Sequence, residues 1–265
     1  MLLPLDKRNI YFDLIGADAD PVVCFGHSLA SDSGMWTEQI PLLLASGYRV
    51  LRVDMIGHGG SDSLPGIYTM DQIADDTAEV IKALEIKNVH YIGLSIGGMY
   101  GQPLGVRHAD KVKSLMLCDT RAAAPAGDKE RRAPTIAKVR NANSLAPIAE
   151  DAMNRWFTKS FQQSNLQRCK QIYDIIIGTS ADGYIGCATA IQNFNYVEQD
   201  PAIKAPTLVM RGSDDHGATP EESQRLLKLI PNSKYDEIAG ARHICNVECP
   251  DAFNKMMMDW LKSNP

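Results

Sequence analysis

Residues 90–101 read HYIGLSIGGMYG, and this stretch decides the fold. An apolar run typical of a buried strand ends at Ser95, and Gly97 and Gly98 stand where a helix is expected to begin. A sharp strand-to-helix turn strains the backbone at the serine, and glycines beside it lack the Cβ atoms that would clash. The pattern Gly-x-Ser-x-Gly therefore predicts a nucleophile elbow that exposes the Ser95 hydroxyl. The alternative is a tight turn whose small residues only permit close packing, which accounts for some of the glycines but not for the serine.

Short apolar runs alternate with longer amphipathic segments on both sides of this stretch. The expected strands are residues 9–15, 22–25, 49–53, 89–93, 112–117, 207–211 and 234–238. Helical spacing of apolar residues predicts helices at 35–45, 71–84, 221–229 and 250–261. Most of the strands are apolar enough to be buried on both faces, as strands of parallel sheets are. The alternation predicts a mainly parallel, doubly wound α/β sheet with helices on both faces.

The alternation breaks between residues 121 and 200. Helices are expected there at 135–139, 148–157 and 166–177, with no strand between them. Pro201 and Pro206 bracket the point where the strand and helix pattern resumes. We therefore expect an α/β core made of residues 1–120 and 201–265, with residues 121–200 inserted as a helical cap.

The composition is that of an ordinary globular protein, with 265 residues, 45% of them apolar and 22% charged. The net charge of −5 gives nucleic acid no electrostatic reason to bind, and the basic cluster at 129–132 predicts a solvated helix face. No long apolar run follows a basic start, so neither a signal peptide nor a membrane span is expected. The six cysteines lack metal-ligand spacing and are interpreted as reduced thiols of a cytoplasmic protein. A homo-oligomer is left open.

A serine hydroxyl needs a base, a group that orients the base, and donors for the oxyanion. His243 is the candidate base, because it follows the last expected strand in a loop, whereas the other histidines lie too early or beside the candidate acid. Asp215 is the candidate acid, because it lies past a strand end, three residues after Gly212, and Asp214 is then a turn or capping residue. The serine, acid, histidine order is the one expected after such an elbow.

Two backbone N–H groups are the expected oxyanion donors, one from the residue after the nucleophile and one from the loop after an early strand. Ile96 supplies the first. Leu29 is the candidate for the second, because His27-Ser28-Leu29 stands where related hydrolases often carry His-Gly-X. His58, in the nearby turn at 54–61, is interpreted as structural rather than catalytic.

Taken together, these residues resemble the α/β-hydrolase superfamily over essentially the whole chain, and within it the 3-oxoadipate enol-lactonase branch. The motifs that carry the resemblance are His27-Ser28-Leu29 with Gly34-Met35-Trp36, Gly93-Leu94-Ser95-Ile96-Gly97, Leu117-Cys118-Asp119-Thr120, Arg155-Trp156-Phe157-Thr158 and His243-Ile244-Cys245-Asn246. The chain departs from the branch at Asp119, where an asparagine is expected, and at His216-Gly217, which adds a residue after the acid.

The resemblance implies a serine hydrolase without cofactor or metal that opens a lactone or enol-lactone through an acyl-enzyme, in the cytoplasmic degradation of aromatic compounds. Ser95 would be the nucleophile, His243 the general base and then acid, and Asp215 the residue that holds the imidazole.

The resemblance also bears on the small-molecule substrate. Trp156 in the cap is expected either to face the substrate or to pack in the core, and Arg155 or Arg242 is a candidate to bind an anionic lactone. Three alternatives stay open: a carboxylesterase for small acyl or aryl esters with the same triad, a carbon-carbon bond hydrolase, and a non-catalytic receptor on the same fold.

Overall fold

The computed structural model describes residues 1–265, and its central element is one eight-stranded sheet in the order β1-β2-β4-β3-β5-β6-β7-β8. The strands are β1 (Leu2–Leu5), β2 (Arg8–Ile15), β3 (Val22–Gly26), β4 (Arg49–Val53), β5 (Val89–Leu94), β6 (Val112–Cys118), β7 (Thr207–Gly212) and β8 (Ser233–Ile238). The α-helices are α1 (Ile40–Ala45), α2 (Met70–Ala83), α3 (Ile96–Arg107), α4 (Asp128–Ala142), α5 (Ala146–Trp156), α6 (Lys159–Ser164), α7 (Leu166–Gly178), α8 (Ala181–Gln192), α9 (Pro220–Leu229), α10 (Cys245–Glu248) and α11 (Pro250–Lys262). Three 3₁₀ helices complete the elements: η1 (Ser33–Trp36), η2 (Ala109–Lys111) and η3 (Asp200–Ala202).

The sheet is mainly parallel. Strands β1 and β2 pair antiparallel at one edge, β2 also runs antiparallel to β4, and all the remaining pairs are parallel. Strands β3, β5 and β7 are buried along their whole length, as their mainly apolar sequences predict. The register aligns Gly26 with Gly93 and Leu94 with Cys118, so the carboxyl ends of β3, β5 and β6 meet at one edge. Binding sites of open α/β sheets form at this edge.

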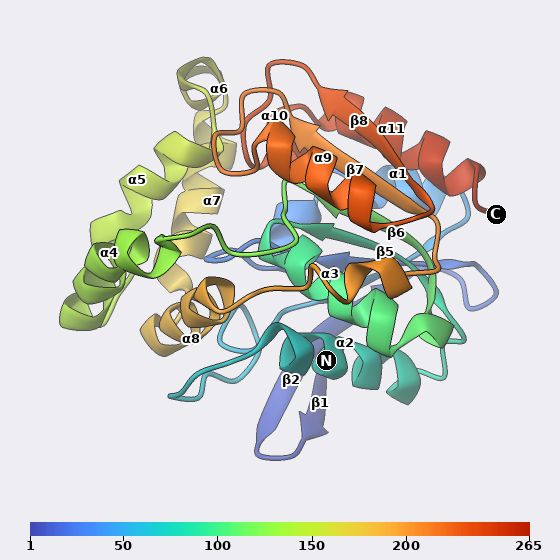
Figure 1. The fold of residues 1–265 in the computed structure, drawn as a ribbon, viewed down its shortest axis with the longest axis horizontal. Coiled ribbons are helices and arrows are strands. Elements are labelled where there is room, and N and C mark those ends of the chain that lie inside the picture. The colour runs from blue at the N-terminus through green and yellow to red at the C-terminus, as the bar shows by residue number, and fades with distance from the viewer.

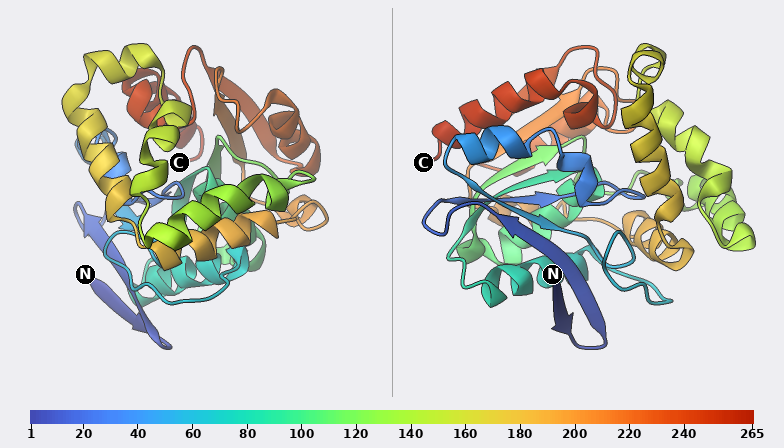
Figure 2. Two further views of the ribbon diagram at one scale, coloured as in Figure 1. Left: turned by 90° about the vertical axis from the view of Figure 1, so that its left-hand side faces the viewer. Right: turned by 180° about the vertical axis from the view of Figure 1, so that it is seen from behind.

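Helices cover both faces of the sheet, so the predicted doubly wound α/β fold is confirmed. Helices α2, α3 and α9 lie on the face toward the viewer in Figure 1, and α1 and α11 lie together on the opposite face, as the reverse view in Figure 2 shows. On that second face the Trp36 ring of η1 packs against Phe253 of α11, with ring centroids 5.9 Å apart.

Helices α4 to α8 all lie between β6 and β7 in the chain, and they form a lobe beside the sheet at the left of Figure 1. We call residues 121–200 the cap. The Cα of Gly183 in α8 meets Gly57 so closely that a Cβ at Gly57 would lie 2.2 Å from it. The cap is thus packed tightly on the loop that follows β4.

Besides the short helices α6 and α10 and the 3₁₀ helices η2 and η3, which were not expected, three differences from the sequence prediction concern longer or paired elements. The single helix expected at 35–45 is divided into η1 and α1, because Pro41 has no N–H to continue a helix from Met35 and instead begins α1. The short strand β1, which contains Pro4, was not expected and pairs with β2 as an edge hairpin. Helix α8 was also not expected, because Gly183 and Gly186 weaken its helical pattern.

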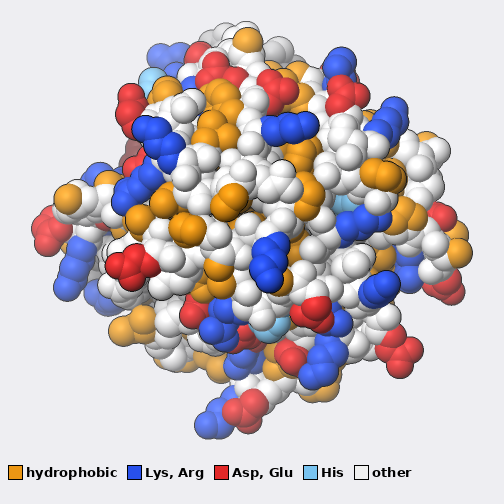
Figure 3. All heavy atoms as spheres, turned by 45° about the vertical axis from the view of Figure 1, so that its right-hand side comes forward, with side chains coloured by type: hydrophobic (Ala, Val, Ile, Leu, Met, Phe, Trp, Pro, Cys, Tyr) orange, Lys and Arg blue, Asp and Glu red, His pale blue; other side chains and the backbone are white.

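Charged side chains of both signs lie on the outer surface that Figure 3 shows. On the face shown in Figure 3, acidic and basic side chains are interspersed rather than gathered by sign. None of the helices combines the length and the apolar character that crossing a membrane would require.

Candidate active site

Ser95 occupies the turn between β5 and α3 with φ 60° and ψ −116°, a conformation that non-glycine residues rarely adopt. The turn is tight enough to exclude side chains at two neighbouring positions. A Cβ on Gly93 would lie 2.3 Å from the carbonyl oxygen of Gly97, and a Cβ on Gly97 would lie 2.2 Å from that of Gly26. The backbone strain predicted at Ser95 is therefore present, and glycine is required on both sides of it.

The structure brings Ser95, His243 and Asp215 into one hydrogen-bonded chain. Ser95 Oγ lies 2.9 Å from His243 Nε2, and Asp215 Oδ2 lies 2.8 Å from His243 Nδ1. Asp215 follows β7, and His243 lies in the loop before α10, so three separate loops at the same sheet edge supply the three side chains. With Nδ1–H donated to Asp215, the Nε2 lone pair of His243 faces the serine hydroxyl.

Asp215 is held as an anion. Its carboxylate accepts the N–H of Gly217 at 2.7 Å and the N–H of Ala218 at 3.0 Å in addition to the His243 ring. Burial opposes the charged form, but the charge of His243 and these hydrogen bonds outweigh it and hold the pKa of Asp215 well below its ordinary value. Asp214 is exposed and accepts the hydroxyl of Ser213, so it takes no part in the chain.

The loop of His243 is tied to the cap. The carboxylate of Glu248 accepts the N–H of Arg242 at 2.6 Å and the N–H of Thr158 at 2.7 Å. The guanidinium of Arg242 donates to the carbonyl oxygens of Asn154, at 2.7 Å, and Phe157, at 3.3 Å. These bonds fix the histidine loop and the end of α5 relative to each other.

The two predicted oxyanion donors lie beside Ser95 with their N–H groups free. Neither the Leu29 N–H nor the Ile96 N–H donates a hydrogen bond within the chain, and both residues are buried. Ile96 begins α3, where the first N–H groups have no helical acceptor and carry the positive end of the helix dipole. Two unpartnered donors next to a nucleophile are what a developing oxyanion requires.

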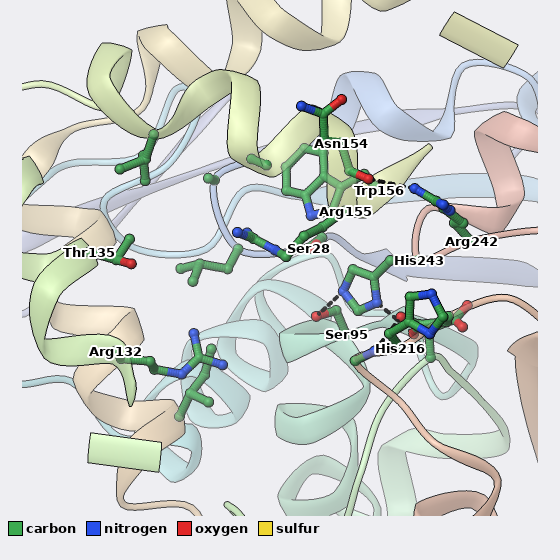
Figure 4. A pocket seen from close by; sticks show the side chains of 18 of the residues that line it. Ser28, Ser95, Arg132, Thr135, Asn154, Arg155, Trp156, His216, Arg242 and His243 are labelled. Carbon is green, nitrogen blue, oxygen red and sulfur yellow. Dashed lines mark hydrogen bonds and ion pairs between the residues drawn. The ribbon is translucent and has the colours of Figure 1, made fainter. Parts of the chain in front are cut away.

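A cavity of about 330 Å³ opens in front of Ser95, between the sheet edge and the cap (Figure 4). Ser28 and Leu29 line it from the core, and Ile148, Trp156 and Tyr184 line it from the cap. Trp156 is buried and also lines the cavity, so both roles expected for it are compatible with its position. The volume suits a small molecule.

Five arginines line this cavity: Arg121, Arg131, Arg132, Arg155 and Arg242. Four of them already have partners. Arg131 and Arg132 share the buried carboxylate of Asp128, Arg121 donates to the carbonyl of Gly217, and Arg242 donates to the cap carbonyls named above.

Arg155 has no hydrogen-bond or ion-pair partner in the chain. Its side chain extends from α5 into the cavity in Figure 4, and the residue is exposed to water. Partial burial lowers the pKa of Arg155, Tyr184 acts against this, and the charge of Arg132 lowers the pKa further, so a nearby anion would offset the repulsion between the two arginines.

Sequence reasoning missed the part of the cavity that α4 and α8 supply. The prediction of a solvated face for residues 129–132 was wrong for Arg132, whose side chain is only 20% exposed and lines the cavity. The sequence carried no signal for this, because the Asp128–Arg132 spacing of four residues is equally compatible with an exposed face of the helix. Tyr184 had no signal of its own, since α8 itself was not expected.

One oxygen each of Asp119 and Asp215 and one nitrogen of His243 lie within 4.8 Å of one another, a spacing that three metal ligands can also have. The carboxyl oxygens are already engaged. Those of Asp215 accept two backbone N–H groups and the histidine, and those of Asp119 accept the Gly212 N–H and the Cys245 thiol. This cluster is therefore built as a hydrogen-bond network rather than as an open set of metal ligands.

Comparison with known proteins identifies the family of the chain. The model of the alpha/beta hydrolase fold family matches residues 21–250. Two curated relatives from Acinetobacter baylyi are 3-oxoadipate enol-lactonase 1, 29% identical over 99% of this chain and 97% of the relative, and 3-oxoadipate enol-lactonase 2, 32% identical over 88% and 86%. The crystal structure of the enol-lactonase from Burkholderia xenovorans LB400 superposes with a TM-score of 0.93 at 31% identity, covering 99% of this chain and 100% of that one. The chain belongs to the α/β-hydrolase family, and within that family it is similar to 3-oxoadipate enol-lactonases.

Proposed function

We propose that this hydrolase opens the ring of a small, negatively charged lactone, an enol-lactone of the 3-oxoadipate type, through an acyl-enzyme on Ser95. The observation that carries the proposal is the chain Ser95, His243, Asp215 with its 2.9 Å and 2.8 Å contacts beside two free N–H groups. On this proposal the enzyme acts in the cytoplasm in the breakdown of aromatic compounds.

The first half of the reaction forms the acyl-enzyme. Ser95 Oγ attacks the lactone carbonyl while its proton passes to His243 Nε2, and Asp215 stabilises the resulting imidazolium. The N–H groups of Leu29 and Ile96 bind the oxyanion of the tetrahedral intermediate. When the intermediate collapses, the ring C–O bond breaks and His243 returns the proton to the departing ring oxygen. In an enol-lactone this oxygen leaves as an enol, which then becomes a ketone.

The second half releases the product. A water molecule attacks the acyl-enzyme carbonyl, its proton passes to His243 Nε2, and the same N–H groups bind the second oxyanion. The Ser95 ester bond breaks and His243 returns the proton to Ser95 Oγ. The products are an open-chain carboxylate and the restored enzyme.

The charge of the cavity supports a substrate that carries a carboxylate. Arg155 is unpaired and reaches the cavity from α5, while the chain as a whole has a net charge of −5. A guanidinium matches a carboxylate geometrically and in charge, and the bond is stronger in a partly enclosed site than in open water. Trp156, next to Arg155 in the chain, offers an apolar wall for the lactone ring.

A substrate panel with a matched pair of serine variants tests the proposal. We expect purified protein to hydrolyse an anionic enol-lactone with a higher kcat/KM than saturated lactones or short p-nitrophenyl esters, and Ser95→Ala to lose at least about a thousandfold. Ser114→Ala, which removes another buried hydroxyl paired only with His90, controls for the cost of losing a buried serine. Faster turnover of acyclic esters would make the protein a carboxylesterase. Labelling of Ser95 by a fluorophosphonate without turnover of any substrate would indicate a receptor.

A further inference from the structure

The carboxyl group of Asp119 is fully enclosed and joins the two segments that carry the acid and the base. Asp119 is the first residue after β6. Its Oδ1 accepts the N–H of Gly212 at 2.8 Å, and its Oδ2 accepts the thiol of Cys245 at 3.0 Å. Gly212 precedes Asp215 by three residues and Cys245 follows His243 by two. The Asp119 side chain therefore joins the start of the loop that carries Asp215 to the end of the loop that carries His243.

The backbone at Asp119 is pinned in an uncommon conformation. Its φ is 45°, in the left-handed region that aspartate and asparagine tolerate better than other residues with side chains. Its N–H donates to the carbonyl of Met210 at 2.8 Å, and the hydroxyl of the next residue, Thr120, donates to the carbonyl of Ser95 at 2.7 Å. The position of this carboxyl is therefore fixed relative to the nucleophile, the acid and the base.

One carboxyl oxygen of Asp119 and one of Asp215 lie within 4.8 Å of each other, and both side chains are buried. Two buried carboxylates this close together repel each other, which favours a proton on one of the pair. The surroundings decide which one. Asp215 accepts two backbone N–H groups and the His243 ring, all of which favour its charged form, whereas Asp119 accepts one backbone N–H and one thiol, which is a weak donor.

We propose that Asp119 is a positioning residue that remains protonated and donates its proton to Asp215, so that Asp215 alone carries the negative charge that orients His243 toward Ser95. The inference rests on the proposed function, because it concerns the same three side chains. Burial raises the pKa of Asp119 well above its ordinary value, and the neighbouring Asp215 charge raises it further, in accord with this arrangement.

The proton on Asp119 does not move during the reaction. When His243 accepts the proton of Ser95, the imidazolium faces one carboxylate whose position is set by three donors and by Asp119. If Asp119 were ionised instead, two like charges would lie within 4.8 Å of each other and would push the acid and histidine loops apart. The neutral acid thus supplies a hydrogen bond without a second charge.

Two substitutions separate the hydrogen bond from the charge. Asp119→Asn has nearly the same shape, donates through its amide to Asp215 and still accepts from Gly212. It no longer offers an acceptor oxygen to the Cys245 thiol. We expect it to keep kcat/KM within about fivefold of the parent protein, whereas Asp119→Leu, which has no polar atoms, should lose about a hundredfold, mainly in kcat. Equal losses in the two variants, or an Asp119→Leu protein with the parent kcat, would overturn the proposal.

An infrared measurement gives a readout that does not depend on turnover or on the fate of the leucine variant. The difference spectrum between the parent protein and Asp119→Asn at neutral pH should contain the carbonyl band of a protonated carboxyl group, shifted in deuterated water. Absence of that band would refute a neutral Asp119.

The rate at which a fluorophosphonate modifies Ser95 separates this inference from the choice of substrate. That rate needs no lactone, and we expect it to fall in Asp119→Leu and to be largely retained in Asp119→Asn. If the parent protein turns over no lactone or ester but its Ser95 reacts and follows this order, the proposed function fails while the role of Asp119 stands. Equal rates in all three proteins would contradict the role of Asp119.

Discussion

The backbone N–H of Ala30 donates a hydrogen bond to Nε2 of His58 over 3.1 Å. Nδ1 of the same ring lies 3.2 Å from the carbonyl of Ile56, so the ring donates there and accepts from Ala30. Burial lowers the pKa of His58 to about 3, which keeps the ring neutral and its acceptor nitrogen available. His58 therefore holds the loop that carries Leu29, a candidate oxyanion donor, in front of Ser95.

Replacing His58 should weaken catalysis through this loop. We expect His58→Ala to lower kcat by about tenfold with little change in KM, because the Leu29 N–H loses its fixed direction and oxyanion binding acts only in the transition state. Steady-state kinetics on the folded variant measure the effect. His90→Ala is the control, because His90 is equally buried but pairs with Ser114 on the neighbouring strand. Equal losses of kcat in the two variants would show that His58 has no specific link to the site.

The elbow should tolerate no side chain at Gly97. A Cβ there would lie 2.2 Å from the carbonyl oxygen of Gly26, a backbone atom that cannot move without breaking β3. We expect Gly97→Ala to lower the free energy of unfolding by at least about 3 kcal/mol or to prevent folding. At Gly105, on the same helix, the closest atom is a flexible methyl of Leu115 at 2.9 Å, so Gly105→Ala should cost far less. Urea denaturation compares the two variants. Similar free energies of unfolding for Gly97→Ala and Gly105→Ala would contradict the claim that the turn excludes a side chain at Gly97.

Much of the sheet could be predicted from the sequence because its strands are buried on both faces. Runs such as residues 22–26 and 89–94 are short, mainly apolar and rich in β-branched and aromatic residues, as buried strands of parallel sheets are. The cap was harder. In α8, Gly183 packs against Gly57 and Gly186 packs against the ring of Tyr68, so neither position has room for a side chain. Because glycine has a low helix propensity, these two residues made the segment look unlike a helix in the sequence.

Part of the candidate site could also be predicted from the sequence and part could not. Ser95, Asp215 and His243 could be placed because each follows a recognisable strand, and parallel strands bring their carboxyl ends to one edge. The inward direction of Arg132 and the pairing of Asp119 with Cys245 could not be predicted, because they depend on how α4 and the loop before α10 pack. Arg155 and Arg242 were equal candidates in sequence, and only the contacts of Arg242 with the cap carbonyls distinguish them.

Stability should depend on pH through Asp200. Both of its oxygens are buried without a hydrogen-bond partner, and burial raises its pKa to about 8 although Arg225 acts against the rise. The folded protein therefore keeps a proton that the unfolded chain, with an ordinary pKa of about 3.9, releases. The free energy of unfolding should fall as pH rises between those values, by up to about 1.4 kcal/mol per pH unit from this group.

Urea denaturation of the parent protein and Asp200→Asn, at about pH 5.5 and about pH 7.5, isolates this contribution. The contributions of other titrating groups cancel in the difference between the two proteins. The free energy of unfolding of the parent should therefore fall relative to that of the variant as pH rises. A difference in the free energy of unfolding that stays constant with pH would show that Asp200 is ionised in the folded state.

Arg155 should matter only for substrates with a negative charge. We expect Arg155→Met to raise KM for an anionic enol-lactone by about tenfold or more, since a charge-assisted hydrogen bond is lost, and to leave a neutral ester almost unaffected. Arg140→Met removes an exposed arginine from α4, outside the cavity, and controls for the change in net charge. An equal rise in KM for both kinds of substrate would mean that Arg155 supports the cap rather than binds a carboxylate.

The central claim, that Ser95 forms an acyl-enzyme with a lactone, is tested most directly by the intact mass of protein quenched with acid during the first turnovers. In a lactone the departing oxygen stays attached to the acyl chain, so Ser95 should gain the full mass of the substrate, whereas an acyclic ester leaves only its acyl part. Fragmentation should place the adduct on Ser95, and Ser95→Ala should gain no mass. Turnover without any adduct, or an adduct that persists in Ser95→Ala, would contradict the claim.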